Sequence, residues 1–352
     1  MVNQAHLEFH STYWHENAGI NFTQYYMGDP LCRLNSLKIY NEKMKQLYQR
    51  LKVTNSFQSQ AIDPIVYGYG VATVPMILGC KVIFADDKDP YAESLDLTDE
   101  EVMQLTPEKD FSNNPVVQDL EQQAAWLMAK YGKACIHINY QSPPNVALKL
   151  RGEQLMIDFF EKPEIAKHII EYTRVSLINL RKWFNEVNRR NNYPSYDRLF
   201  SLDNCTVALL SPNIYRDFFL PGDKKSFEEF KDNFGIHHCG GNMHLFAEYY
   251  GSMPGARWYD IGYGSDIKQC LNKFNMRAED ALISVRYGPA KLLHAKPGDI
   301  VRELDDINSC GATTILCLGA ESNTHDDNIR AYLSWTPKEP YQHNKCVATL
   351  KL

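Results

Sequence analysis

The chain lacks the long apolar runs and basic stripes that would suit a membrane or a nucleic acid. None of its apolar stretches approaches the roughly 20 residues that a membrane span needs. Its formal net charge is −6, and the basic pair Arg189–Arg190 ends a helical pattern, where cations complement the helix dipole. We therefore expect neither a nucleic-acid nor a membrane partner. The first residues lack the basic and apolar regions of a secretory leader, so we expect a cytoplasmic protein.

Several motifs and linkers are absent as well. No Gly-x-Gly-x-x-Gly follows the first β-rich runs, which weakens a dinucleotide-binding interpretation. There is no Asp-x-His-x-x-Gly pattern for cobalamin, and no Ser- or Pro-rich linker divides the chain. The nine cysteines are an odd number in no repeating framework, which indicates reduced thiols rather than a disulfide scaffold. Each cysteine must therefore be considered singly.

Short β-rich runs alternate with longer amphipathic stretches along most of the chain. The β-rich runs cover 81–85, 135–140, 199–202, 235–239, 257–261, 281–287 and 313–318, and the clearest helical patterns cover 36–51, 114–131, 163–188 and 211–233. This alternation predicts parallel strands joined by crossover helices, and its length and regularity favour a (β/α)8 TIM barrel over an open sheet. We expect an aromatic-rich, helical N-terminal extension over 1–60, packed on a barrel over 61–340, in one domain.

The segment Gly235-Ile236-His237-His238-Cys239-Gly240-Gly241 carries the clearest chemical signal. Side chains alternate along a strand, so His237 and Cys239 share one face and His238 takes the other. The glycines end the strand, which places the pair at the rim where barrel enzymes assemble their sites. An imidazole beside a thiolate suits zinc, although a lone His-x-Cys also occurs in ordinary cores.

Two side chains do not hold a zinc ion, so the site needs a third ligand. Cys317 lies near the end of the last predicted strand, and a His-Cys-Cys set would leave one coordination position open. Core packing is the competing interpretation for a cysteine in so apolar a strand. Cys310 is a rival ligand, but it falls at a helix end on the opposite side of the last βα unit.

Other polar residues end neighbouring predicted strands and could reach the same rim. Asp203 and Asn204 are candidate catalytic residues, with Asp203 as a fourth ligand or a general base. Asp260, Arg286 and Tyr287 are candidate substrate-binding residues. A strand-end aspartate also serves commonly as a helix N-cap, so this second interpretation stays open.

The chain resembles the uroporphyrinogen decarboxylase superfamily, and within it the zinc- and corrinoid-dependent methyltransferases, of the methylcobamide:CoM methyltransferase and O-demethylase types. The resemblance covers about 130–335. The segments that carry it are Leu150-Arg151-Gly152, Asp158-Phe159-Phe160-Glu161-Lys162-Pro163-Glu164, Asp203-Asn204, Leu210-Ser211-Pro212, His237-His238-Cys239-Gly240, Gly311-Ala312 and Asp327-Asn328-Ile329-Arg330-Ala331. It implies zinc ligands at His237, Cys239 and Cys317, although the Pro-Gly-Cys-Gly surround usual for the last cysteine is absent.

The resemblance implies methyl transfer between a small donor or thiol and the cobalt of a corrinoid, in anaerobic one-carbon metabolism. The corrinoid would arrive on a separate binding protein, and a methoxylated aromatic compound is one candidate donor, which would make the reaction an O-demethylation. A homodimer is a common assembly in the superfamily. Two alternatives remain: a decarboxylase-like lyase acting on a carboxylated substrate, and a metal-free barrel that only docks a corrinoid protein. The Arg-Gln-Ala-Gly-Arg segment of the decarboxylases is missing, which disfavours a substrate with many carboxylates.

Overall fold

The computed structural model describes residues 4–60, 62–193, 200–230, 234–253, 256–274 and 282–337. Its largest sheet has six parallel strands in the order β1-β10-β9-β8-β7-β6. These strands are β1 (Gln4–Phe9), β6 (Phe200–Asp203), β7 (Phe234–His238), β8 (Trp258–Ile261), β9 (Leu282–Arg286) and β10 (Thr314–Ala320). A second parallel pair joins β2 (Ile65–Val66) to β5 (Cys135–Ile136).

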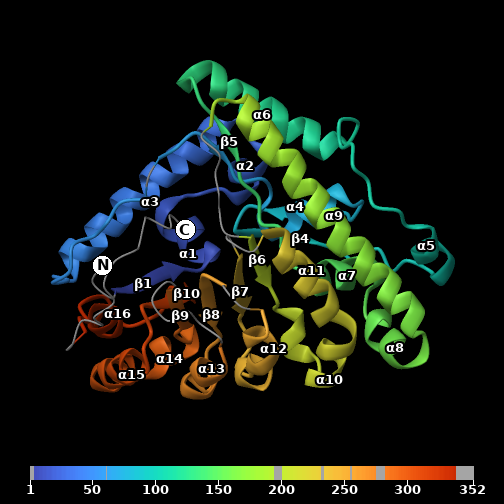
Figure 1. The fold of residues 1–352 in the computed structure, drawn as a ribbon. Coiled ribbons are helices and arrows are strands. Elements are labelled where there is room, and N and C mark those ends of the chain that lie inside the picture. The colour runs from blue at the N-terminus through green and yellow to red at the C-terminus, as the bar shows by residue number, and fades with distance from the viewer. Residues whose placement is uncertain are drawn as a thin grey trace.

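The first strand of the chain pairs with the last, which is how a barrel closes. Leu7 of β1 is in register with Cys317 of β10, and Figure 1 shows the blue β1 beside the red and orange C-terminal elements. In chain order, β2 and β5 fall between β1 and β6. The segment after β5 is joined to the end of β6 by side chains: Ser142 Oγ, at the start of α7, and Asn145 Nδ2, within it, donate to the carbonyl of Asp203 at 2.8 and 2.6 Å. The eight parallel strands thus follow the order of a (β/α)8 barrel, as predicted.

Two details differ from the sequence prediction. The segment 1–60 contains three helices, but it opens with β1, where polar His6 and Glu8 alternate with buried Leu7 and Phe9. This short alternation of polar and apolar residues is the pattern of a strand with one buried face. The predicted run at 81–85 is a strand, β3 (Val82–Ala85), but it forms an antiparallel hairpin with β4 (Lys88–Ala92) outside the parallel set.

Helices cover the outside of the strands, and their ends carry conventional caps. For example, Asn114 accepts hydrogen bonds from the amides of Val116 and Val117, and Gly132 ends that helix with φ 73°. The α-helices are α1 (Ser11–Ala18), α2 (Phe22–Met27), α3 (Pro30–Arg50), α4 (Thr73–Ile77), α5 (Asp99–Gln104), α6 (Pro115–Tyr131), α7 (Pro143–Arg151), α8 (Gln154–Glu161), α9 (Pro163–Arg190), α10 (Pro212–Ile214), α11 (Leu220–Phe230), α12 (Ala247–Gly251), α13 (Ile267–Lys273), α14 (Pro289–His294), α15 (Pro297–Ser309) and α16 (Asp326–Leu333). Short turns of other helix types are η1 (Gly70–Ala72), η2 (Thr206–Leu209), η3 (Tyr215–Phe219) and η4 (Met243–Leu245). Among the described helices, none combines the length and apolar composition needed to cross a bilayer.

The strand register sorts side chains into a barrel face and a helix face. Asp203, His237 and Asp260 are register partners on β6, β7 and β8, so they point to the same face. His238 is fully buried and packs on Phe246 and Tyr250 of the helix layer, with ring centroids 5.2 and 5.9 Å away. His237 therefore faces the barrel and His238 faces the helices, as the alternation predicted.

Candidate metal centre

Three side chains at the ends of two adjacent strands could hold a metal ion. His237 and Cys239 come from β7 and the turn after it, and Cys205 lies two residues after the last residue of β6. One ligand atom from each residue lies within 4.8 Å of the other two. Cys239 is exposed, whereas Cys205 is half-buried. The site therefore offers two sulfurs and one nitrogen on a rim that a small molecule can reach.

His237 is oriented by two residues from the next strands. Its Nδ1 lies 2.6 Å from Asp260 Oδ2, which leaves Nε2 free to serve as a ligand atom. Arg286 Nε donates to both oxygens of the same carboxylate, at 3.0 and 2.8 Å. A carboxylate behind a ligand histidine fixes the orientation and tautomer of its ring. Asp260 and Arg286 thus lie behind His237 and support it.

The protonation of Cys205, His237 and Cys239 depends on the hydrogen bonds that they make with one another and with Asp260. Hydrogen bonds from Cys205 and His237 lower the pKa of Cys239 to about 4. Burial opposes protonation of His237, but its hydrogen bonds to Asp260 and Cys239 prevail and raise its pKa to about 9. The hydrogen bond to Cys239, together with burial, raises the pKa of Cys205. Without a metal, the group is therefore a thiolate between an imidazolium and a neutral thiol.

Asp203 faces the barrel beside these ligands. Ser201 Oγ donates a hydrogen bond to Asp203 Oδ1, and burial is the main cause that raises the pKa of this carboxyl. Nearby His237 and Arg286 oppose that rise, whereas Asp260 adds to it. A carboxyl group with a raised pKa beside metal ligands suits a residue that takes or gives a proton.

The structure does not bring Cys317 to this site. Leu316 of β10 is the register partner of Arg286, so Leu316 shares the barrel face and Cys317 points to the opposite face. There Cys317 is fully buried near Tyr287 and Tyr332, whose pKa values it raises, and burial raises its own pKa to about 12. β10 presents Cys317 to the helices, so Cys317 cannot join His237 and Cys239. In the part of the chain that the structure describes, Cys205 is the cysteine that completes the group instead.

Two further predicted site residues lie on the helix face. Asn204 is fully buried, and its Nδ2 lies 3.4 Å from the hydroxyl oxygen of Tyr250. Tyr287 is buried against Tyr332, with ring centroids 5.4 Å apart. Alternation explains both positions, since each residue directly follows one that faces the barrel. The rival ligand Cys310 is the C-terminal cap of α15, outside the group that could hold a metal.

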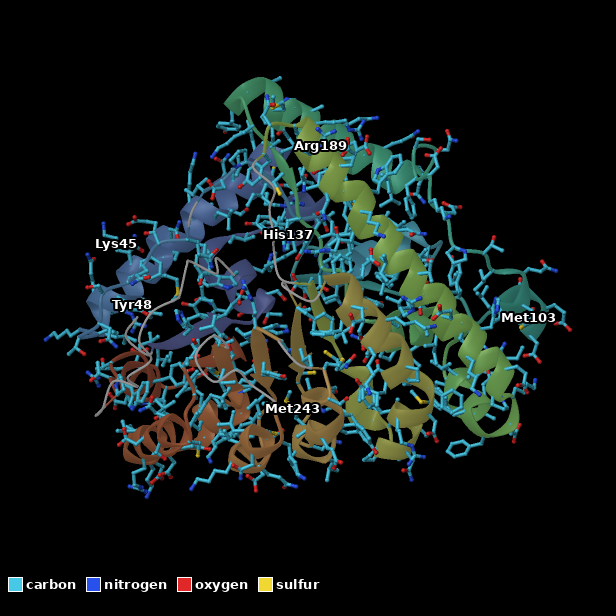
Figure 2. All side chains as sticks on the ribbon, in the orientation of Figure 1. Lys45, Tyr48, Met103, His137, Arg189 and Met243 are labelled. Carbon is cyan, nitrogen blue, oxygen red and sulfur yellow. The ribbon has the colours of Figure 1, made fainter. Side chains whose placement is uncertain are left out.

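Sequence reasoning missed Cys205, although a signal was present. The residue directly follows Asp203-Asn204, a pair already predicted at the rim of the neighbouring strand. Beyond its strand end the chain enters the turn before η2, where Asn145 Oδ1 accepts a hydrogen bond from the amide of Thr206 at 2.9 Å. Alternation places Asp203 on the barrel face and Asn204 on the helix face, and continued one residue further it returns Cys205 to the side of Asp203. In Figure 2, the labelled His137, after β5, and Met243, in η4, lie on either side of the strands β6–β8.

The fold and the site together define a (β/α)8 barrel with a group of two cysteines and a histidine at its rim that could hold a metal ion. The chain matches the family described as uroporphyrinogen decarboxylase (URO-D) over residues 51–321, and it therefore belongs to that family. Among solved structures it is similar to a methyltransferase from Methanosarcina mazei, with a TM-score of 0.61 and 13% sequence identity. That match covers 95% of this chain and 92% of the other chain. At such low identity it shows a shared fold. No curated protein matches the sequence significantly.

Proposed function

We propose that this protein is a zinc-dependent methyltransferase that moves a methyl group between a small donor or thiol and the cobalt of a corrinoid carrier protein. One observation carries the proposal: Cys205, His237 and Cys239 gather at the rim of a URO-D family barrel. The fold shared with a methyltransferase supports the same reaction class.

The donor set fits a catalytic zinc. Three protein ligands with sulfur and nitrogen donors are typical of such sites, where the fourth position takes water or substrate. Zinc bound there would polarise the heteroatom that carries the methyl group, or stabilise a thiol as its thiolate. His237 would enter this set with its ring already oriented by Asp260. The exposure of Cys239 supports access by a substrate.

Proton transfer in this reaction falls to Asp203. When cobalt(I) takes the methyl group with its own electron pair, the donor heteroatom leaves with a negative charge and needs a proton. When a thiol is the acceptor, its proton must leave. A carboxyl whose pKa is raised by burial can exchange a proton in either direction. We assign that role to Asp203, which faces the ligands through its register with His237.

The donor that we propose is a methoxylated aromatic compound, so that the reaction is an O-demethylation. Trp258 offers an aromatic surface on the barrel side, since its ring is stacked with that of His237 at a centroid distance of 6.4 Å. Tyr25 of the N-terminal aromatic segment and Tyr67, just after that segment, are half-buried; burial is the main cause that raises the pKa of Tyr25, and the nearby Tyr67 and Glu8 add to the rise. Apolar rings of this kind favour a flat, apolar donor.

The corrinoid carrier would dock at the same rim. Four large apolar side chains are exposed on segments that end or follow barrel strands, namely Leu209, Leu245, Tyr263 and Leu318. Exposed apolar side chains that gather at one end of a barrel suit contact with a protein. A second copy of the chain is the alternative occupant of this rim, which would make the protein a homodimer. We also keep the prediction of a cytoplasmic location.

A decarboxylase-like lyase is the second candidate, but the site does not favour it. Such an enzyme needs free arginines around Asp203 to hold substrate carboxylates. Among the described residues, Arg286 is the arginine that affects the pKa of Asp203, and Asp260 already occupies its Nε and Nη2 groups. A carboxylated substrate would have to compete with that ion pair.

A methyl-transfer assay tests the proposal. The purified protein, with and without zinc, is mixed with cobalt(I) corrinoid and a panel of methoxylated aromatics, other methyl donors and thiols. Formation of methyl-cobalt is followed by its visible absorption. We expect transfer that requires zinc and falls at least about 100-fold in Cys205→Ala. Full transfer after removal of the metal would contradict the proposal. Release of CO2 from a carboxylated substrate, without methyl transfer, would favour the lyase.

A further inference from the structure

A chain of hydrogen bonds runs behind the ligands, on the helix face of the strands. His238, between two ligands, has Nδ1 2.9 Å from the Tyr250 hydroxyl oxygen and Nε2 2.9 Å from Asn242 Oδ1. The same hydroxyl oxygen of Tyr250 lies 3.4 Å from Asn204 Nδ2. At the other end, Asn242 Nδ2 donates to the carbonyl of Ala208 at 3.0 Å.

The donors and acceptors of this chain fit one arrangement. The amide nitrogen of Asn204 can only donate, so the Tyr250 oxygen accepts from it and gives its own hydrogen to Nδ1 of His238. His238 then carries its hydrogen on Nε2 and donates to Asn242 Oδ1, which leaves the amide nitrogen of Asn242 for Ala208. In this order the His238 ring carries a single hydrogen, on Nε2. The four side chains thus hold one another in a single orientation.

The hydrogen-bond chain joins the two segments that carry all three ligands. It starts at Asn204, next to Cys205, and returns to the same segment at Ala208. In between it passes through His238, which is flanked by His237 and Cys239. The segments 204–208 and 237–242 are therefore tied at two points, one on each side of Cys205.

The two segments also touch directly. A Cβ atom added at Gly240 would lie 2.3 Å from Ala208 Cβ and 3.0 Å from Asn242 Oδ1. This approach is too close for any side chain larger than that of glycine. The distance between the two segments is consequently fixed both by contact and by the hydrogen bonds.

We infer that the side chains of Asn204, Tyr250, His238 and Asn242 position Cys205 against His237 and Cys239, so that the ligand set is assembled before a metal binds. Tyr250 is the positioning residue of this group, because its hydroxyl joins the two strand ends. The inference rests on the proposed metal centre and is independent of methyl transfer. A preassembled site binds its ion more tightly because little conformational entropy is lost on binding.

Tyr250→Phe tests this role, since it removes the hydroxyl and keeps a ring that packs on Phe246 and Tyr215. We expect its affinity for Zn2+, measured by chelator competition, to fall about 10- to 100-fold. In the Co2+-loaded protein, the absorption bands that report thiolate coordination and ligand geometry should change. The free energy of unfolding of the metal-free protein is measured alongside, to separate positioning from simple stability.

Tyr332→Phe is the matched control. Tyr332 is equally buried, and its hydroxyl lies 3.1 Å from the carbonyl of His6 and 3.2 Å from that of Ile315, behind β1 and β10. This variant should lose stability but keep the metal affinity and cobalt spectrum of the unmodified protein. Unchanged affinity and spectrum in Tyr250→Phe would overturn the inference. Absence of tight metal binding in the unmodified chain would overturn the metal centre as well, whereas failure of the methyl-transfer assay alone would leave this inference standing.

Discussion

His237 shows how much the proposed metal site depends on the residues behind its side chain. Asp260 fixes the histidine through Nδ1, and Arg286 holds Asp260 in turn. Burial would raise the pKa of Asp260, but the hydrogen bond from His237 and the charge of Arg286 prevail and lower it. Asp260 is therefore an ionised carboxylate that keeps the His237 ring in one orientation and stabilises its protonated form until a metal displaces the proton.

The first prediction concerns pH. A metal must displace protons from His237, whose pKa is raised to about 9, and from Cys205, whose pKa is also raised. The metal-free form thus binds more protons than the metal-bound form, so the apparent affinity for Zn2+ should rise as the pH increases from about 6 to 9. In Asp260→Asn, which loses the carboxylate charge, this rise should shift to lower pH. Chelator competition at several pH values measures both effects, and an affinity independent of pH would contradict the account.

At this scale, alternation along a strand is the part of the site that sequence could predict. It assigned His237 and His238 correctly to opposite faces. The same rule puts Cys317 on the helix face once the pairing of β10 with β9 is known. That pairing register depends on the tertiary structure and cannot be read from the sequence. Cys205 lies two residues after Asp203, so the same rule continued past the strand end places it beside Asp203; it was missed because the rule was applied only up to Asn204.

At the scale of elements, the turn after β7 is shaped by close backbone contacts. A Cβ atom at Gly262, just after β8, would lie 2.3 Å from the carbonyl oxygen of Gly240 and 2.5 Å from that of His238. Ser265 Oγ adds a hydrogen bond to the carbonyl of Gly240 at 3.2 Å. The segment that carries Cys239 is thus held from behind by the loop of the next strand.

Gly262→Ala should therefore disturb the metal centre without touching a ligand. The added methyl group meets backbone atoms, which cannot move aside as a flexible side chain can, so we expect a loss of about 1–3 kcal/mol in stability and weaker Zn2+ binding. Gly298→Ala, in the first turn of α15, is the control, since its Cβ would meet only Arg302 Nη1 at 3.9 Å. Urea unfolding and metal titration of both variants provide the test. Equal behaviour of the two variants would count against a supporting role for Gly262.

The elements themselves were predictable to different degrees. The long helices α6 and α9 have caps and apolar periodicity over many residues, so their patterns are clear in the sequence. The strands β2 and β5 contain two residues each, too few for any periodicity to show. β1 was missed because its alternation lies next to a dense group of aromatic residues that suggests helices and loops.

At the scale of the whole molecule, the N-terminal segment belongs to the barrel. β1 pairs with β10 along its whole length and so joins the first and last elements of the parallel set. Behind it, Phe9 is 4% exposed and stacks on Tyr13 at a centroid distance of 3.9 Å. Because closure depends on this strand, the packing of Phe9 contributes to the stability of the entire fold.

Phe9→Ala should accordingly destabilise the protein by about 3 kcal/mol or more, the usual cost of removing a buried aromatic ring. Met27→Ala, at a side chain that is 59% exposed, should change the free energy of unfolding by less than about 0.5 kcal/mol. Urea unfolding monitored by tryptophan fluorescence compares the two. A small effect of Phe9→Ala would show that the N-terminal strand is not needed for a stable barrel.

The most direct test of the metal centre compares two cysteines by metal analysis of purified variants. Cys205 lies within 4.8 Å of the His237 and Cys239 ligand atoms, whereas Cys317 is buried on the opposite face of its strand. We predict about one zinc per chain in the unmodified protein. We also predict the same content in Cys317→Ser, with some loss of stability, and little or no zinc in Cys205→Ser. Zinc retained in Cys205→Ser but lost in a folded Cys317→Ser would contradict the account.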